Sequence, residues 1–149
     1  MDLKNKKILL VIGGGISAYK SLDLIRLLQR KSCLIKVVLT KTGKKFVTSL
    51  SISSLSKNRV FEDTFGEKNN GKVDHISLSR WADVIVALPS TANFMSKLSR
   101  GSADDLASTI ILASNKDIFL VPAMNVRMWL HKATQKNLNC LIEYGYKFI

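Results

Sequence analysis

The feature of this sequence that most constrains its fold is an apolar run, Lys7–Ile12, that stops at three consecutive glycines, Gly13–Gly15. A continuous apolar run of this length is typical of a strand that is buried on both faces, as in a parallel sheet. After the glycines, apolar residues recur at helical spacing and mark one helix face: Ala18, Leu22, Ile25 and Leu28. The sequence therefore predicts a strand, a glycine turn and a helix.

Strands and helices alternate through the rest of the sequence. Strands are predicted at 35–39, 84–88 and 118–121, the last two ended by Pro89 and Pro122, and another begins at 146–149. Helices are predicted at 46–55, within 98–113 and through Leu138 to a stop at Gly145, and 67–72 is predicted to be a loop. This alternation indicates one α/β domain, residues 1–149, with a Rossmann-like, doubly wound and mostly parallel sheet.

Composition excludes several classes of function. The sequence has no apolar run long enough to span a membrane and no signal peptide, so we expect a cytoplasmic protein. Cys33 and Cys140 are assigned to packing, and without a CxxC motif or a His pair we expect no metal site. The net charge of +12 comes from scattered lysines without interleaved aromatic residues. We expect an anionic small-molecule substrate rather than nucleic acid.

Polar motifs follow the predicted strands, at the sheet edge where α/β proteins bind ligands: Gly13–Ser17, Thr40–Thr42, Pro89–Asn93 and Pro122–Asn125. The glycines suit either a phosphate site or a tight turn. They lack the third glycine of the dinucleotide fingerprint, so a mononucleotide fits better. Residues 89–93 offer hydroxyl and amide groups to a flavin, or an ordinary helix N-cap.

Two further segments are candidates for chemistry. His75 precedes an amphipathic segment and is either a catalytic or a structural histidine, whereas His131 is expected to be a solvated helix residue. Within Pro122–Trp129, Asn125 offers an amide NH₂ group to a carboxylate. The Met and Trp side chains of that segment line a pocket or belong to the core.

Five segments carry a resemblance to a known family. Residues 122–129 match the PxMNxxMW motif of the flavin-dependent cysteine decarboxylases, and residues 89–93 resemble their PASANT motif. Residues 101–106 resemble their G-x-A-[DN]-[DN]-L segment, and His75 lies in the context of their active-site histidine. Residues 14–20 are similar to the opening of the phosphopantothenoylcysteine decarboxylase domain of bacterial coenzyme A synthesis.

The resemblance implies a flavoprotein-type subunit that binds FMN between the subunits of a trimer or a multiple of trimers. It implies cofactor contacts at Gly14, Gly15, Ile16, Thr40, Phe46, Thr91, Ala92, Asn93, Phe94 and Met124. By the same resemblance, His75 is the catalytic base and Asn125 holds the substrate carboxylate. The family often has a serine where this sequence has Gly13, which removes one phosphate contact.

The implied reaction converts 4′-phosphopantothenoylcysteine to 4′-phosphopantetheine. FMN oxidises the thiol-bearing carbon, the adjacent carboxylate leaves as CO₂, and FMN returns the hydride. The family carries a substrate-covering flap with an Ala-Cys-Gly motif beyond the last helix, and this sequence ends at Ile149. Two alternatives therefore stand beside this reading: a non-catalytic FMN-binding or regulatory subunit, and a peptide-cysteine oxidative decarboxylase. A separate phosphopantothenate–cysteine ligase is an expected partner.

Overall fold

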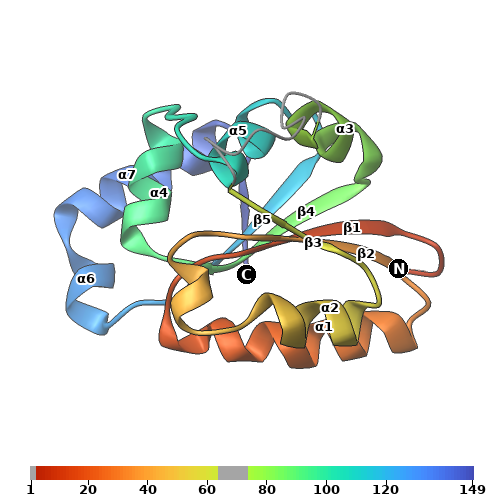
Figure 1. Cartoon of the computed structure of the whole chain (residues 1–149). Coiled ribbons are helices and arrows are strands. Elements are labelled where there is room, and N and C mark those ends of the chain that lie inside the picture. Colours follow the sequence, from red (N-terminus) through yellow and green to blue (C-terminus); the bar gives the residue numbers. More distant parts are fainter. Residues whose placement is uncertain (1–2, 64–73) are drawn as a thin grey trace.

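The computed structural model describes residues 3–63 and 74–149 and has a parallel sheet at its centre (Figure 1). The order of the six strands is β3-β2-β1-β4-β5-β6, and every neighbouring pair is parallel. The strands are β1 (Lys7–Ile12), β2 (Leu34–Leu39), β3 (Val60–Glu62), β4 (Val84–Ser90), β5 (Asp117–Pro122) and β6 (Lys147–Phe148). The confirmed fold class is a Rossmann-like α/β fold.

Helices cover both faces of the sheet because its central strands are apolar on both sides. Ile8, Leu10 and Ile12 of β1 pack in the cluster under α1 (Lys20–Arg30) and α2 (Ser49–Ser56). Leu9 and Val11 pack in the opposite cluster, which also contains side chains of the helices on that face. These helices are α3 (Asp74–Trp81), α4 (Ala92–Ser99), α5 (Leu106–Leu112) and α7 (Lys132–Glu143).

Short helical segments lie next to the carboxyl ends of the strands. The 3₁₀ turns η1 (Ile16–Tyr19) and η2 (Gly43–Lys45) follow β1 and β2, and α6 (Val126–Leu130) follows β5. In Figure 1, α6 lies on the same side of the molecule as the beginning of α1. The parallel strands therefore bring these segments to one edge, although they are far apart in the sequence.

The central strand β1 joins distant parts of the chain. It pairs with β2 on one side and with β4 on the other, where Ile8 lies opposite Val84. The backbone N–H of Lys7 also donates to Oδ2 of Asp83 at 2.9 Å. The first strand of the sequence thus depends on contacts with residues from both halves of the chain.

Some sequence predictions need correction. The helix expected at 46–55 begins only at Ser49, because the Thr48 side chain caps it by accepting a hydrogen bond from the N–H of Ser51 at 3.1 Å. The strand β3 was not predicted, since its three residues are too few for a clear pattern. The helix expected within 98–113 is confirmed as α5, which begins at Leu106 after the N-cap Asp105.

The remaining boundaries lie within a few residues of the sequence predictions. The main difference is that β4 and β5 continue through Pro89 and Pro122, where the sequence predicted that they end, and Ser90 pairs with Pro122. The helix α7 ends before Gly145, which has a positive φ of 89°. The loop predicted at 67–72 lies outside the described residues. Within residues 3–63 and 74–149, no helix is long and apolar enough to cross a membrane.

Candidate functional site

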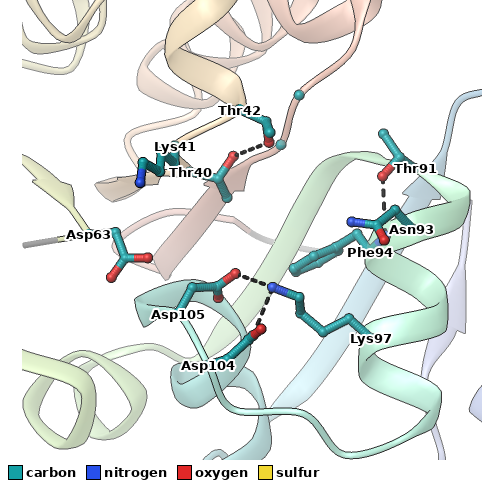
Figure 2. A pocket seen from close by; sticks show the side chains of 12 residues that line it. Thr40, Lys41, Thr42, Asp63, Thr91, Asn93, Phe94, Lys97, Asp104 and Asp105 are labelled. Atoms are coloured by element: carbon teal, nitrogen blue, oxygen red, sulfur yellow. Dashed lines mark hydrogen bonds and ion pairs between the residues drawn. The ribbon is translucent and has the colours of Figure 1, made fainter. Parts of the chain in front are cut away.

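A cavity of about 400 Å³ opens at the carboxyl ends of β1, β2 and β4 (Figure 2). Its walls come from the glycine turn after β1, the segments that follow β2 and β3, the helix α4 with its N-cap, and the segment that leads into α5. The residues that line it are Gly13, Gly14, Thr40, Lys41, Thr42, Asp63, Thr91, Asn93, Phe94, Lys97, Asp104 and Asp105. Three of the four polar motifs found in the sequence therefore meet at one cavity.

The glycine turn is shaped by close approach to its neighbours. A Cβ atom on Gly14 would lie 2.6 Å from Cβ of Thr42, so only glycine fits at this position without movement of the segment after β2. A Cβ atom on Gly13 would meet the carbonyl oxygen of Pro89. The serine that the resembled family often carries at position 13 would clash there, which gives a steric reason for Gly13 in this chain.

The side chain of Thr40 joins two of the cavity walls. Its hydroxyl donates to the carbonyl oxygen of Ile12 at 3.1 Å and accepts the N–H of Gly43 at 3.0 Å. A further hydrogen bond, 3.3 Å long, connects the hydroxyls of Thr40 and Thr42. The end of β1 and the start of η2 are thereby fixed relative to each other.

The beginning of α4 forms the opposite wall. Thr91 is the N-cap and accepts the N–H of Phe94 at 3.2 Å, so the N-cap interpretation of this motif is correct. Asn93 is exposed toward the cavity, whereas Phe94 is 8% exposed and also belongs to the core. The positive end of the α4 dipole therefore faces the cavity, which favours an anionic group such as a phosphate.

An ion-pair cluster also lines the cavity. The Lys97 ammonium lies 2.6 Å from Oδ2 of Asp105 and 2.8 Å from Oδ1 of Asp104. Asp105 is also the N-cap of α5 and accepts the N–H of Ser108 at 2.7 Å. Asp63 accepts the N–H of Leu106 in the same first turn at 3.3 Å. Two carboxylates thus bind the N-terminus of α5.

The pKa values in this cluster shift in different directions. Burial is the largest single influence on Asp105 and Lys97 and favours their neutral forms, but the hydrogen bonds and charges around them together outweigh it. The pKa of Asp105 is therefore lowered by Lys97 and Ser108, and the pKa of Lys97 is raised by Asp104 and Asp105. For Asp63, burial dominates over the Leu106 N–H, and the nearby Asp105 charge adds to it, so the pKa of Asp63 is raised. Of Asp63 and Asp105, Asp63 is the one whose ionised form the folded structure disfavours.

The sequence interpretation assigned no site role to Lys97 or Asp63. Lys97 lies one turn after the polar motif at 89–93, and that spacing was an available signal. Asp63 follows β3, the strand that was not predicted, so nothing in the sequence placed it at the sheet edge.

Several predicted cofactor contacts do not line this cavity. Gly15 and Ile16 come directly after the lining residue Gly14 but do not line the cavity themselves, and the Ile16 side chain is 80% exposed. Ala92 lies at the start of α4 without lining it, and Phe46 is 46% exposed after η2. Met124 borders a second hollow of about 420 Å³ instead, together with Pro122, Ala123, Trp129, Phe148 and Ile149.

The predicted catalytic base, His75, and the predicted carboxylate-binding residue, Asn125, also lie outside the first cavity. His75 is half-buried near the start of α3. Asn125 is the N-cap of α6 and accepts the N–H of Met128 at 2.9 Å through Oδ1, which leaves its NH₂ group for another partner. It lines a third, largely apolar hollow of about 620 Å³. His131, expected inside a helix, instead caps α7 by accepting the N–H of Ala133.

Metal chemistry has no visible site in the described part of the chain. Among residues 3–63 and 74–149, no group of three His, Cys, Asp or Glu side chains is placed to hold a metal ion.

Comparisons with known proteins agree with the fold and the motifs. A family model described as Flavoprotein matches residues 1–149. The chain is 40% identical over 147 residues to the coenzyme A biosynthesis bifunctional protein CoaBC of Bacillus subtilis (strain 168), covering 99% of this chain and 36% of that protein. The CoaBC protein of Haemophilus influenzae is 42% identical over 149 residues, covering 100% and 37%. The chain thus spans little more than a third of these relatives.

Solved structures give the same picture. The FMN-binding protein AtHal3 superposes with a TM-score of 0.84 at 31% identity, covering 98% of this chain and 80% of that one. A PPC decarboxylase mutant complexed with pantothenoylaminoethenethiol has a TM-score of 0.83 at 30% identity, covering 98% and 82%. The FMN-dependent cysteine decarboxylase SpaF has a TM-score of 0.88 at 29% identity, covering 100% and 85%.

Proposed function

The chain belongs to the flavoprotein family, and from this premise we propose that it is an FMN-dependent decarboxylase of 4′-phosphopantothenoylcysteine. The product would be 4′-phosphopantetheine, an intermediate of coenzyme A synthesis. The relatives that match nearly all of this chain at about 40% identity are coenzyme A biosynthesis proteins, which favours this substrate over other cysteine-ended compounds.

The observation that carries the proposal is the convergence of three separate segments on one cavity. Five of the proposed cofactor contacts line it: Gly14, Thr40, Thr91, Asn93 and Phe94. The bare backbone of Gly14, the Thr40 hydroxyl and the N-terminus of α4 are groups that suit a phosphate and a polyol chain. These residues would hold FMN, and a bound flavin would supply the reversible hydride transfer that the reaction needs.

The remaining proposed contacts support a site that is shared between copies of the chain. Ile16, Phe46 and α6 follow the carboxyl ends of β1, β2 and β5, so they lie along one edge of the sheet. This edge exposes an unusual number of apolar side chains, with Ile16 at 80% and Val126 and Leu130 each at 67%. Exposed apolar surface of this kind marks interfaces. We assign it to contact between subunits of a trimer or a multiple of trimers.

Asn125 and His75 would act on the substrate. The hydrogen bond from Met128 fixes the orientation of the Asn125 amide, so its NH₂ group can donate to the substrate carboxylate. His75 would accept a proton from the substrate, as a general base. Because these groups lie outside the cavity that would hold the phosphate, we assign the reactive end of the site to the subunit interface.

The synthesis of the substrate requires joining a phosphorylated pantothenate to cysteine. The relatives are bifunctional, and this chain spans 36–37% of their length. We propose that a phosphopantothenate–cysteine ligase supplies the substrate, and that residues 1–149 form one FMN-binding domain.

The test is an anaerobic visible spectrum of the FMN-loaded protein, before and after addition of 4′-phosphopantothenoylcysteine. The proposal expects a flavin band that bleaches on addition, together with release of CO₂. A flavin band that never responds would favour a non-catalytic FMN-binding subunit. Response only to a peptide with a C-terminal cysteine would favour a peptide-cysteine decarboxylase. Absence of bound flavin after reconstitution with FMN would overturn the proposal as a whole.

A further inference from the structure

We infer that Lys97 is a positioning residue of the cofactor cavity: it ties α4 to the segment at 100–105 and to the N-terminus of α5. This inference rests on the proposed function, since it assigns the cavity to FMN. It gives a role to residues 101–106, which resemble a family motif but take no part in the proposed reaction.

Lys97 is placed to connect two walls of the cavity. Its side chain is 18% exposed and extends from α4 to the carboxylates of Asp104 and Asp105, as Figure 2 shows. The residues between α4 and α5 form no helix or strand. The N–H groups of residues 100–102 bond back to α4, and the two ion pairs fix the carboxylates at the other end of this segment.

The connection continues from Lys97 into α5. Asp105 binds Lys97 through Oδ2, while its Oδ1 accepts the N–H and the hydroxyl of Ser108. One carboxylate thus holds both the lysine and the first turn of α5. A charged hydrogen bond of this kind, only 23% exposed on the Asp105 side, is stronger than a surface ion pair. A change at Lys97 would therefore also affect the position of the first turn of α5, which forms one wall of the cavity.

The charge of Lys97 matters as well as its reach. Five charged side chains line the cavity, and three of them are carboxylates: Lys41, Asp63, Lys97, Asp104 and Asp105. Without Lys97, the exposed Lys41 would be the only cation among these lining residues. A cofactor with a phosphate group would then enter a cavity dominated by carboxylates.

The experiment measures FMN binding to the apoprotein by flavin fluorescence, without any turnover. Lys97→Met should raise the dissociation constant roughly tenfold, which corresponds to about 1.4 kcal/mol. Lys97→Arg keeps the charge and the paired geometry and should restore most of the affinity. Asp105→Asn keeps an N-cap residue for α5 while it removes the charged partner of Lys97, so it should weaken FMN binding similarly. Combining it with Lys97→Met should add little further loss, as expected for one coupled pair.

A control variant separates positioning from a general loss of stability. Lys136→Met removes an exposed lysine of α7 that does not line the cavity. It should bind FMN within about twofold of the wild type, the scatter expected of surface changes. Unchanged FMN affinity in a folded Lys97→Met variant would overturn the inference and leave the proposed function standing. A wild-type protein that binds no FMN would overturn both.

Discussion

Two regions at the same edge of the sheet differ in how completely this one chain builds them. Around the glycine turn, Thr40 bonds the end of β1 to the start of η2, and Thr91 caps α4 on the opposite wall of the cavity. Around α6, Asn125 has its cap bond but faces an open, largely apolar hollow with exposed neighbours such as Val126. In the proposed site, one chain would build the phosphate end, and a second subunit would supply the opposing wall of the reactive end.

The sharpest way to separate the two regions is His75→Asn. The proposed base lies outside the cavity, so FMN should remain bound while decarboxylation falls by about 10²- to 10⁴-fold, the usual contribution of general base catalysis. Single-turnover release of CO₂ measures the rate, and the visible spectrum measures the bound flavin. His131→Asn is the matched control, because asparagine also caps a helix. Full turnover in the His75 variant would show that the base is elsewhere.

Gly14→Ala tests the enclosed region. The added methyl group would lie 2.6 Å from Cβ of Thr42 and would push two walls of the cavity apart. We expect the dissociation constant for FMN to rise at least about tenfold, which corresponds to a loss of about 1.4 kcal/mol of binding free energy. Unchanged FMN affinity in a folded Gly14→Ala variant would argue against the close approach at Gly14.

A double change on α6, Val126→Asp with Leu130→Asp, tests the open region. Both side chains are 67% exposed, and two carboxylates in an apolar interface should prevent assembly. Analytical ultracentrifugation should give the monomer mass for this variant and a trimer or larger for the wild type. Leu27→Asp on α1 is the control, because Leu27 is 55% exposed away from this edge. An unchanged mass in the α6 variant would place the interface elsewhere.

Asn125→Asp separates the two roles proposed for Asn125. Aspartate caps a helix as well as asparagine does, so stability in urea should stay within about 0.5 kcal/mol of the wild type. The substrate carboxylate would lose an NH₂ donor and meet a like charge, so KM should rise about tenfold or more. Asn125→Ala should instead lose about 1 kcal/mol of stability with the cap. An unchanged KM in the aspartate variant would remove Asn125 from substrate binding.

The smallest effect concerns the two carboxylates at the N-terminus of α5. The pKa of Asp63 is raised in the folded protein, so its ionised form costs stability at neutral pH, and that cost disappears as pH falls through the raised pKa. Asp63→Asn keeps an acceptor for the Leu106 N–H and should stabilise the protein at pH 7 by up to about 0.5 kcal/mol. Urea unfolding at pH 7 and near pH 4 should show this advantage shrinking at the lower pH.

The opposite pH dependence is expected for Asp105. Its lowered pKa gives stability that is present above the ordinary value of 3.8 and is lost as pH falls through the folded-state pKa. Asp105→Asn should therefore destabilise the protein at pH 7 and lose that effect in acid. The same sign of change in both variants at pH 7 would contradict the assignment of the two shifts.

Sequence patterns predicted the enclosed region better than the open one, for a physical reason. A long apolar run such as Lys7–Ile12 predicts a buried strand directly. Parallel strands then bring the segments that follow their carboxyl ends to one edge of the sheet. The resemblance to flavin-dependent cysteine decarboxylases is confirmed by the family match and by the relatives. Asp63 and Lys97 escaped prediction because their roles depend on which segments meet in space, which no local pattern records.

The central position of β1 has a consequence for how the protein is made. Its amino end is bonded to Asp83, 76 residues further along the chain, and β4 follows directly. A ribosome must therefore release the chain as far as β4 before the first strand can be enclosed on both sides. Contacts this distant in sequence form slowly, and the exposed strand edge invites aggregation in the meantime. We expect the yield of folded protein to depend on the pace of synthesis between β2 and β4 more than on any single residue of the cavity.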